Sequence, residues 1–233
     1  MQNCTIEDKE LGLIKVQVNV RARQFVFHIK RDAIYVSVPP GVVTKDLKHA
    51  LNNVRDKLIA CRQNFPEPII DLDYKIDAEL FKLTLVEGSK DSFFAKTKLG
   101  SMQIICPPHT DFSDEQLQKW LRKVICESLR RNAKKILPPR LLALSREYEL
   151  PFQKVSINSS RGRWGSCSVK KHINLSFFLL LLPSHLINYV LLHELSHTRE
   201  MNHGEKFWKL LNNISKGKAT VLKEEIKSYH TDI

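Results

Sequence analysis

Apolar and polar residues alternate with period two through much of the first part of the chain. The alternation is clearest in IKVQVNV (14–20), QFVFHIK (24–30) and AIYVSVP (33–39). Such alternation is typical of β-strands with one buried face. Arg31-Asp32 lies between the last two segments like a tight turn, so the pattern predicts a meander of neighbouring strands.

A helix and three further strands are predicted after this meander. Thr44 can cap a helix whose apolar residues recur at helical spacing and which ends before Pro66. The alternating segments that follow are LFKLTLVE (80–87), FFAKTKL (93–99) and SMQIICPP (101–108).

Helical spacing dominates after Pro107-Pro108. Ser113 and Gln116 match a capping box, and the helix after them has one apolar face. A second helix is predicted from Pro138 to about Tyr148. The segments KVSINSS (154–160) and HINLSFF (172–178) are typical of short strands on either side of RGRWGSCS (161–168).

Three more helices are predicted towards the C-terminus. The first begins at Pro183 and meets no breaker until Asn202, and the second runs from near Gly204 to Gly217. The last is ATVLKEEIKSYH (219–230). We therefore expect an α+β chain with a β-rich, antiparallel N-terminal domain (1–110) and a mainly helical C-terminal domain (111–233). No internal repeat is visible in the sequence.

Composition places this chain among folded globular proteins. Hydrophobic residues make up 42% of the 233 residues and charged residues 27%. The five cysteines are widely spaced and form no CxxC pair, which excludes a cysteine-based zinc knuckle and disfavours a disulfide framework. Because the N-terminal residues also lack the pattern of a signal peptide, we expect a cytoplasmic protein.

The longest apolar region does not predict a membrane span. The segment INLSFFLLLLPSHLINYVLLHEL (173–195) is interrupted by Pro183, Ser184, His185 and Asn188, whereas a spanning helix needs about 20 mostly apolar residues. A buried core segment is the better interpretation.

The net charge of +12 admits a polyanionic partner such as a nucleic acid or a nucleotide. The alternative is a surface of solvated lysines, because the charge is spread along the chain rather than gathered in one run.

The segment HELSHTREMNHGEKFW (193–208) carries the strongest chemical signal. His193 and His197 are four residues apart, so on a helix their imidazoles share one face and can bind one ion. With Glu194 they form an HExxH motif, in which two histidines hold zinc and the glutamate is the general base for the zinc-bound water.

A third ligand would complete a catalytic zinc site. His203 can supply it only if the chain turns back after the helix, and Asn202 and Gly204 both tolerate the left-handed conformation that such a turn would use. Glu200 is a competing ligand, or a residue that orients one imidazole. Taken singly, these residues could instead be a buried histidine, a solvated charge and a helix cap.

RGRWGSCS (161–168) admits two interpretations. Gly162 and Gly165 let the backbone approach a neighbour closely, and an arginine beside an aromatic ring suits an extended or anionic ligand along a strand edge. The alternative is a structural bulge with Trp164 in the core. Cys167 could reach the ion as a thiolate, or be a small buried residue.

These motifs together resemble the YgjP-like zinc metallopeptidase family, and more distantly WLM and SprT-type proteases. The resemblance rests on RWGSCS (163–168), INLSFFLLLLP (173–183), YVLLHELSH (189–197) and NHGEKFW (202–208). It implies zinc held by His193, His197 and His203, with Glu194 as the catalytic base. It also implies that Arg163, Trp164 and Ser166 line the substrate cleft.

The chain departs from the family pattern only beside the ligands. Ser196 stands where a small residue such as alanine is common, and Gly204 stands where serine is common. The chain is also distinct from metzincins, which have glycine at the position of Glu200 and a later methionine that is absent here.

The sequence therefore predicts a zinc-dependent hydrolase, most simply a metallopeptidase with a peptide or protein substrate and no membrane attachment. One alternative, which the family resemblance also suggests, is a metal-dependent nucleoside triphosphate pyrophosphohydrolase. Another is a nucleic-acid-associated protease that acts on DNA-bound proteins. Cleavage specificity, the group that stabilises the oxyanion and the oligomeric state are not determined by these patterns.

Overall fold

The structure is a computed structural model that describes residues 4–8, 10–29, 33–63 and 68–231. The chain divides into two compact units, Met1–Pro68 and Ile69–Ile233. The expected boundary near residue 110 falls inside the second unit. The reason is that Phe81 and Leu83 share one hydrophobic core with Leu121 and Ile125, which lie beyond that boundary.

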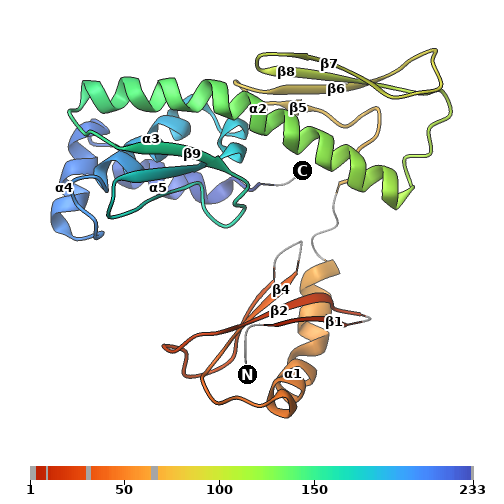
Figure 1. The fold of residues 1–233 in the computed structure, drawn as a ribbon, viewed down its shortest axis with the longest axis horizontal. Coiled ribbons are helices and arrows are strands. Elements are labelled where there is room, and N and C mark those ends of the chain that lie inside the picture. The colour runs from red at the N-terminus through yellow and green to blue at the C-terminus, as the bar shows by residue number, and fades with distance from the viewer. Residues whose placement is uncertain (1–3, 9, 30–32, 64–67, 232–233) are drawn as a thin grey trace. The chain divides into compact units, whose positions relative to one another are not determined.

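The first unit is a four-stranded sheet with one helix against it (Figure 1). Its elements are β1 (Cys4–Asp8), β2 (Gly12–Val18), β3 (Val26–Ile29), β4 (Ile34–Val38) and α1 (Thr44–Gln63). The strand order is β1-β2-β4-β3, and β2 and β4 run parallel. Leu47, Leu51 and Leu58 of α1 are buried in the same core as the strands.

The predicted strands of this unit are confirmed, but the meander is wrong. β4 lies between β2 and β3, with buried Ile34, Val36 and Val38, whereas every residue of β3 is at least partly exposed. β4 thus has a paired strand on each side, and its buried side chains lie in one core with the apolar residues of α1. The turn expected at Arg31-Asp32 lies outside the described residues.

The second unit begins with a sheet of the same topology. The predicted strands of residues 80–108 are confirmed as β6, β7 and β8, and the sheet consists of β5 (Ile76–Asp77), β6 (Lys82–Glu87), β7 (Phe94–Lys98) and β8 (Ser101–Cys106). Its order is β5-β6-β8-β7, with β6 and β8 parallel and both outer pairs antiparallel. An arrangement of four strands followed by a helix thus occurs twice, although no repeat is visible in the sequence.

A single long helix, α2 (Glu115–Glu147), follows this sheet. The prediction of two helices separated near Pro138 is wrong, because both Pro138 and Pro139 lie inside α2. Buried Ala133, Leu137 and Leu141 continue one apolar stripe across the prolines, and this packing stabilises a helix that the missing N–H groups would otherwise interrupt.

The start of α2 also differs from the prediction. The carboxylate of Asp114, not the hydroxyl of Ser113, accepts a hydrogen bond from the backbone N–H of Gln116, while Ser113 donates to Asp111. The predicted capping box is therefore wrong, since an aspartate one residue further along caps the helix.

A third sheet and the remaining helices complete the second unit. The predicted strands are confirmed as β9 (Lys154–Asn158) and β11 (His172–Ser176), with β10 (Gly165–Cys167) between them in the chain and the order β10-β11-β9. The helices are η1 (Phe177–Leu181), α3 (Ser184–Ser196), α4 (Glu205–Ile214), α5 (Ala219–Glu225) and η2 (Ile226–Ser228). The fold is thus a mixture of helices and small sheets, as expected.

Helix α3 is held at its N-terminal end by two other parts of the unit. Arg140 of α2 donates from Nε to Oδ1 of Asn188 at 2.7 Å and from Nη2 to the carbonyl of Ser184 at 2.8 Å. The carboxylate of Glu79 accepts from the backbone N–H of Ser184 at 3.1 Å. The contact from Glu79 satisfies one N–H group of the helix start, because Pro183 has no side chain that could cap it.

Helix α3 ends at Ser196, so the expected continuation to Asn202 is wrong. The hydroxyl of Thr198 donates to the carbonyl of Leu195 at 2.8 Å, and the N–H of Thr198 bonds to the same carbonyl. This tight last turn ends the helix at the second histidine, before His203. Within the part of the chain that the structure describes, no helix is long and apolar enough to cross a membrane.

We expect the ion pair between Asp8 and Arg55 to stabilise the first unit in a pH-dependent way. Arg55 donates to both carboxylate oxygens of Asp8 and, with the N–H of Leu11, holds the pKa of that carboxyl well below its usual range. A depressed folded-state pKa contributes stability above the unfolded pKa of about 3.9, and this contribution is lost as pH falls through the folded value. Asp8→Asn should therefore speed amide exchange in β2 and α1 more at pH 7 than at low pH. An equal effect at both pH values would contradict this role.

Candidate metal centre

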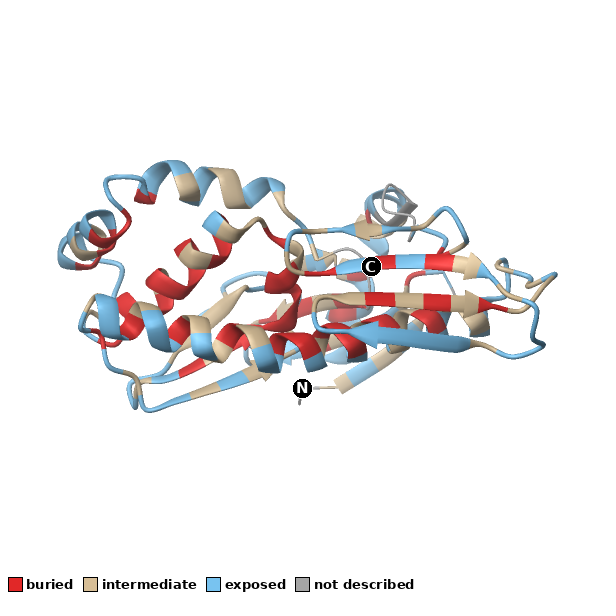
Figure 2. Cartoon of the chain, turned by 90° about the horizontal axis from the view of Figure 1, so that it is seen from above, coloured by how far each residue is buried: buried red, intermediate tan, exposed pale blue. Residues whose placement is uncertain are grey.

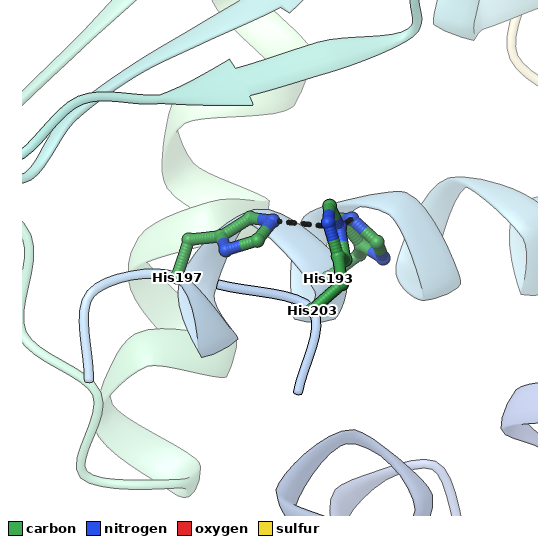
Figure 3. A group of neighbouring side chains, drawn as sticks. All are labelled: His193, His197 and His203. Carbon is green, nitrogen blue, oxygen red and sulfur yellow. Dashed lines mark hydrogen bonds between the residues drawn. The ribbon is translucent and has the colours of Figure 1, made fainter. Parts of the chain in front are cut away.

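The last turns of α3 and the loop after it bring three histidines together. His193 and His197 project from one face of α3, as their spacing predicted, and the chain then reverses so that His203 returns to them just before α4. Their ligand nitrogens lie within 4.8 Å of one another. Figure 3 shows the three rings turning nitrogen atoms towards a common point.

Two of the three nitrogen–nitrogen separations suit a tetrahedral metal ion. Nε2 of His203 lies 3.1 Å from Nε2 of His193 and 3.2 Å from Nε2 of His197. Zinc–nitrogen bonds of about 2.0–2.1 Å in tetrahedral geometry give nitrogen–nitrogen separations of about 3.3 Å. Three imidazole nitrogens at one point also cannot all be satisfied by sharing protons with one another, so a cation is their natural common partner.

The backbone fixes the orientation of one imidazole. Nδ1 of His197 lies 3.1 Å from the carbonyl oxygen of Glu200, and a hydrogen bond there places the proton on Nδ1 and the lone pair on Nε2. The expected orienting role of Glu200 is thus carried by its main chain. In the described residues, the metal-ligand cluster contains the three histidines and not the carboxylate of Glu200.

Burial keeps two of the imidazoles neutral, as metal ligands must be. Burial, followed by the neighbouring imidazoles, lowers the pKa of His193 to about 3. Burial also lowers the pKa of His197, opposed by its hydrogen bond to the Glu200 carbonyl. At neutral pH these rings therefore present lone pairs, and no proton has to leave them before an ion binds.

The turn that returns His203 differs from the one expected. Gly204 has φ −80° and ψ −176°, and Asn202 does not have a positive φ either. The N–H of Gly204 instead bonds to the carbonyl of Asn202 at 2.7 Å, which closes a compact turn around His203. No left-handed residue is needed here.

Two aromatic residues of α4 support the histidines. Phe207 is fully buried, and its ring stacks on His197 at a centroid distance of 4.5 Å and meets the rings of His193 and His203 edge-on. Trp208 donates from Nε1 to the carbonyl of His203 at 3.1 Å, and Nζ of Lys223 from α5 lies 4.5 Å from its ring. The periodicity of α4 indicated an apolar face but not this role.

Glu194 is buried beside the histidines, against the edge strand β10. Its side chain is almost fully inaccessible, and its Oε2 has no hydrogen-bond partner among the described residues. Burial raises the pKa of this carboxyl to about 8, and the nearby charge of Arg163 opposes that shift. A buried carboxylate with an unpaired oxygen needs a compensating positive charge, and a cation at the histidines would supply it.

The close approach predicted at Gly165 is made to this carboxylate. A Cβ atom on Gly165 would lie 2.7 Å from Cγ and 2.8 Å from Oε1 of Glu194. Only a residue without a side chain leaves Glu194 its present position.

The other residues of RGRWGSCS lie around this contact. Arg163 is exposed, Trp164 is half-buried against the core, and Ser166 points to the opposite face of β10 from Gly165 by strand alternation. Burial and the charge of Glu194 raise the pKa of the Cys167 thiol to about 11, so it is no thiolate, and it lies outside the metal-ligand cluster. A substrate cleft lined by Arg163, Trp164 and Ser166 stays a prediction.

Comparison with known proteins agrees with this geometry. The profile of the YgjP-like metallopeptidase domain matches residues 23–229, which includes part of the first unit as well as the whole histidine cluster. No curated protein and no solved structure matches the chain. Because the family profile covers most of its length, the chain belongs to the YgjP-like metallopeptidase family.

Proposed function

We propose that this protein is a zinc-dependent peptidase in which His193, His197 and His203 hold the ion and Glu194 is the general base. The observation that carries the proposal is the convergence of three imidazole nitrogens beside a buried carboxylate whose Oε2 has no hydrogen-bond partner among the described residues. A set of three nitrogen ligands with a fourth position left open is typical of catalytic zinc. The family supports metal-dependent hydrolysis.

The ion would provide one part of the chemistry. When bound, zinc acts as a Lewis acid that polarises a carbonyl group and makes a water molecule acidic near neutral pH. The three imidazoles are suited to zinc because they are borderline ligands in a fixed arrangement.

Glu194 would supply the proton transfer. Oε2 carries no hydrogen bond, so it is available to accept a proton from the attacking water and to pass it to the leaving amine. The burial that raises its pKa favours the protonated state once the proton is taken, whereas a cation at the histidines favours the carboxylate beforehand. A general base needs this balance between its two states.

Peptides are the proposed substrates, and the nucleotide alternative rests on fewer observations. The charge of Arg163 acts on Glu194, and a guanidinium there would also suit a phosphate. Pyrophosphate release from nucleoside triphosphates, measured beside cleavage of casein, separates the two activities. Cleavage of a protein only in the presence of DNA would favour the nucleic-acid-associated alternative.

Glu194→Gln should retain zinc and lose hydrolysis by roughly 10²- to 10⁴-fold, because an amide cannot accept the proton. Metal content by mass spectrometry and casein cleavage are the two measurements.

Alanine at each of the three histidines should remove the ion, whereas His49→Ala on α1 and Glu200→Gln should leave ion and activity unchanged. Wild-type activity in zinc-loaded Glu194→Gln would refute the assignment of the base, and a wild type without zinc affinity would refute the site.

Gly165→Ala should lower activity while leaving zinc in place. The added methyl group would overlap the carboxylate of Glu194 and force it to move, because the three atoms nearest to it all belong to Glu194. A 1 Å displacement of a catalytic group can cost about 10²-fold in rate. The measurement is kcat with zinc occupancy determined on the same sample. An unchanged kcat would show that Glu194 can shift without consequence.

Trp208→Phe should weaken zinc binding by roughly tenfold while keeping the aromatic packing. The variant keeps an aromatic ring at this position but loses the hydrogen bond from Nε1 to the His203 carbonyl, which holds the third imidazole in place. Competition with a fluorescent chelator would measure the affinity. Trp120→Phe on α2 is the matched control and should have no effect, because Trp120 lies outside the cluster.

A further inference from the structure

The second unit contains a groove of about 530 Å³ between the edge strand β7 and helix α2, away from the residues of the metal centre. We call it the β7–α2 groove. Ala95, Thr97 and Leu99 line it from the strand and the turn after it, and Trp120, Val124 and Ser128 line it from the helix.

The groove exists because β7 carries small side chains where the sheet faces α2. Ala95 pairs with Ile104 and Thr97 with Met102, so these four residues share one face of the sheet. Ile104 and Met102 are buried, whereas Ala95 and Thr97 are exposed. The layer between sheet and helix is therefore filled beneath β8 and open beneath β7.

The topological repeat provides an internal comparison. In the first unit, Phe27 and Ile29 of β3 occupy the positions that correspond to Ala95 and Thr97, because they pair with Val36 and Ile34 in the same register. Both large side chains pack against the core of that unit. The same fold thus closes this space in the first unit and leaves it open in the second.

The strand beside the groove is an unpaired edge. β7 is the outermost strand of its sheet, and every residue of it is exposed (Figure 2). In the part of the chain that the structure describes, its backbone makes no hydrogen bonds apart from those to β8. Such an edge offers N–H and carbonyl groups to an incoming extended segment.

The charge around the groove selects the segment. Lys98, Lys123, Arg131 and Lys135 line it, and the one acidic residue of its described lining, Glu127, lies 3.4 Å from Nε of Arg131. Lysines at an edge repel a basic strand, including a second copy of a chain with net charge +12, and they lose hydration without compensation when a neutral strand covers them. A segment with carboxylates would instead be attracted by these positive charges.

Helix α2 also contributes a polar residue to the lining of the groove. Ser128 is buried, and its hydroxyl has no hydrogen-bond partner among the described residues. The neighbouring Asn132 accepts from the N–H of Gly100 at 2.6 Å and donates to the carbonyl of Ser128, which fixes the β7–β8 turn to α2 at one end of the groove. The groove is therefore held open by its own structure.

We propose that the β7–α2 groove binds an extended, acidic segment of another polypeptide. The segment adds to β7 as a further strand, and every second side chain enters the groove over Trp120 and Val124. Its carboxylates face the lysines and the arginine of the rim. Binding here does not depend on the proposed hydrolysis, so the site is defined separately from the metal centre.

The test uses the full chain carrying Glu194→Gln, so that a bound peptide is not cleaved. Fluorescein-labelled peptides that alternate valine with glutamate, or valine with lysine, are titrated by fluorescence anisotropy beside a single-stranded oligonucleotide. The acidic peptide should bind, and its binding should slow amide exchange at residues 94–98. Binding of the oligonucleotide but not of the acidic peptide would overturn the proposal, as would binding of both peptides alike.

Two sets of variants locate the binding. Lys123→Glu with Lys135→Glu should weaken it by roughly tenfold more than Lys119→Glu with Lys134→Glu, which change the net charge equally on the same helix but lie outside the groove. Ala95→Phe with Thr97→Ile installs the residues of the first unit and should abolish binding while the thermal transition stays unchanged. Equal losses in both charge variants, or unchanged affinity in the filled groove, would refute the site.

Discussion

The metal centre depends on one electrostatic constraint: three imidazole nitrogens meet at a point where they cannot share enough protons to satisfy one another. Burial removes the option of charging His193 and His197, and the carbonyl of Glu200 fixes the proton of His197 on the far side of its ring. The lone pair of His197 Nε2 therefore faces the other two rings. A cation would resolve this arrangement and would at the same time give the buried Glu194 an opposite charge.

Much of this site follows from local sequence, and the rest does not. The spacing of His193, Glu194 and His197 fixes their directions on any helix, so those residues could be predicted. The contact between Gly165 and Glu194 was foreseen only as some close approach, because its partner is set by packing between β10 and α3. The support from Phe207 and Trp208 was missed, since periodicity shows that a face is apolar but not what it touches.

The fold shows the same division between local and long-range information. Alternation located β6, β7 and β8, but strand order depends on which strand is buried most, so the position of β4 was wrong. Pro138 and Pro139 are strong local signals for a helix end, and tertiary packing of the stripe through Leu137 and Leu141 overrides them. The repeated topology could not be seen in the sequence, because the two sheets have the same strand order and the same pattern of buried positions but different amino acids at those positions.

The continuity of α2 has a mechanical consequence. One helix of 33 residues, about 50 Å long, provides packing surface for the sheet of β5–β8 at one end and for β9 and η1 at the other, and its Arg140 holds α3. If either sheet came away from α2, apolar residues of the helix would be exposed to water, and the helix that supports the other sheet would be destabilised. The second unit should therefore behave as a single cooperative block, in which an ion bound by the histidines adds to the protection of amides far from it.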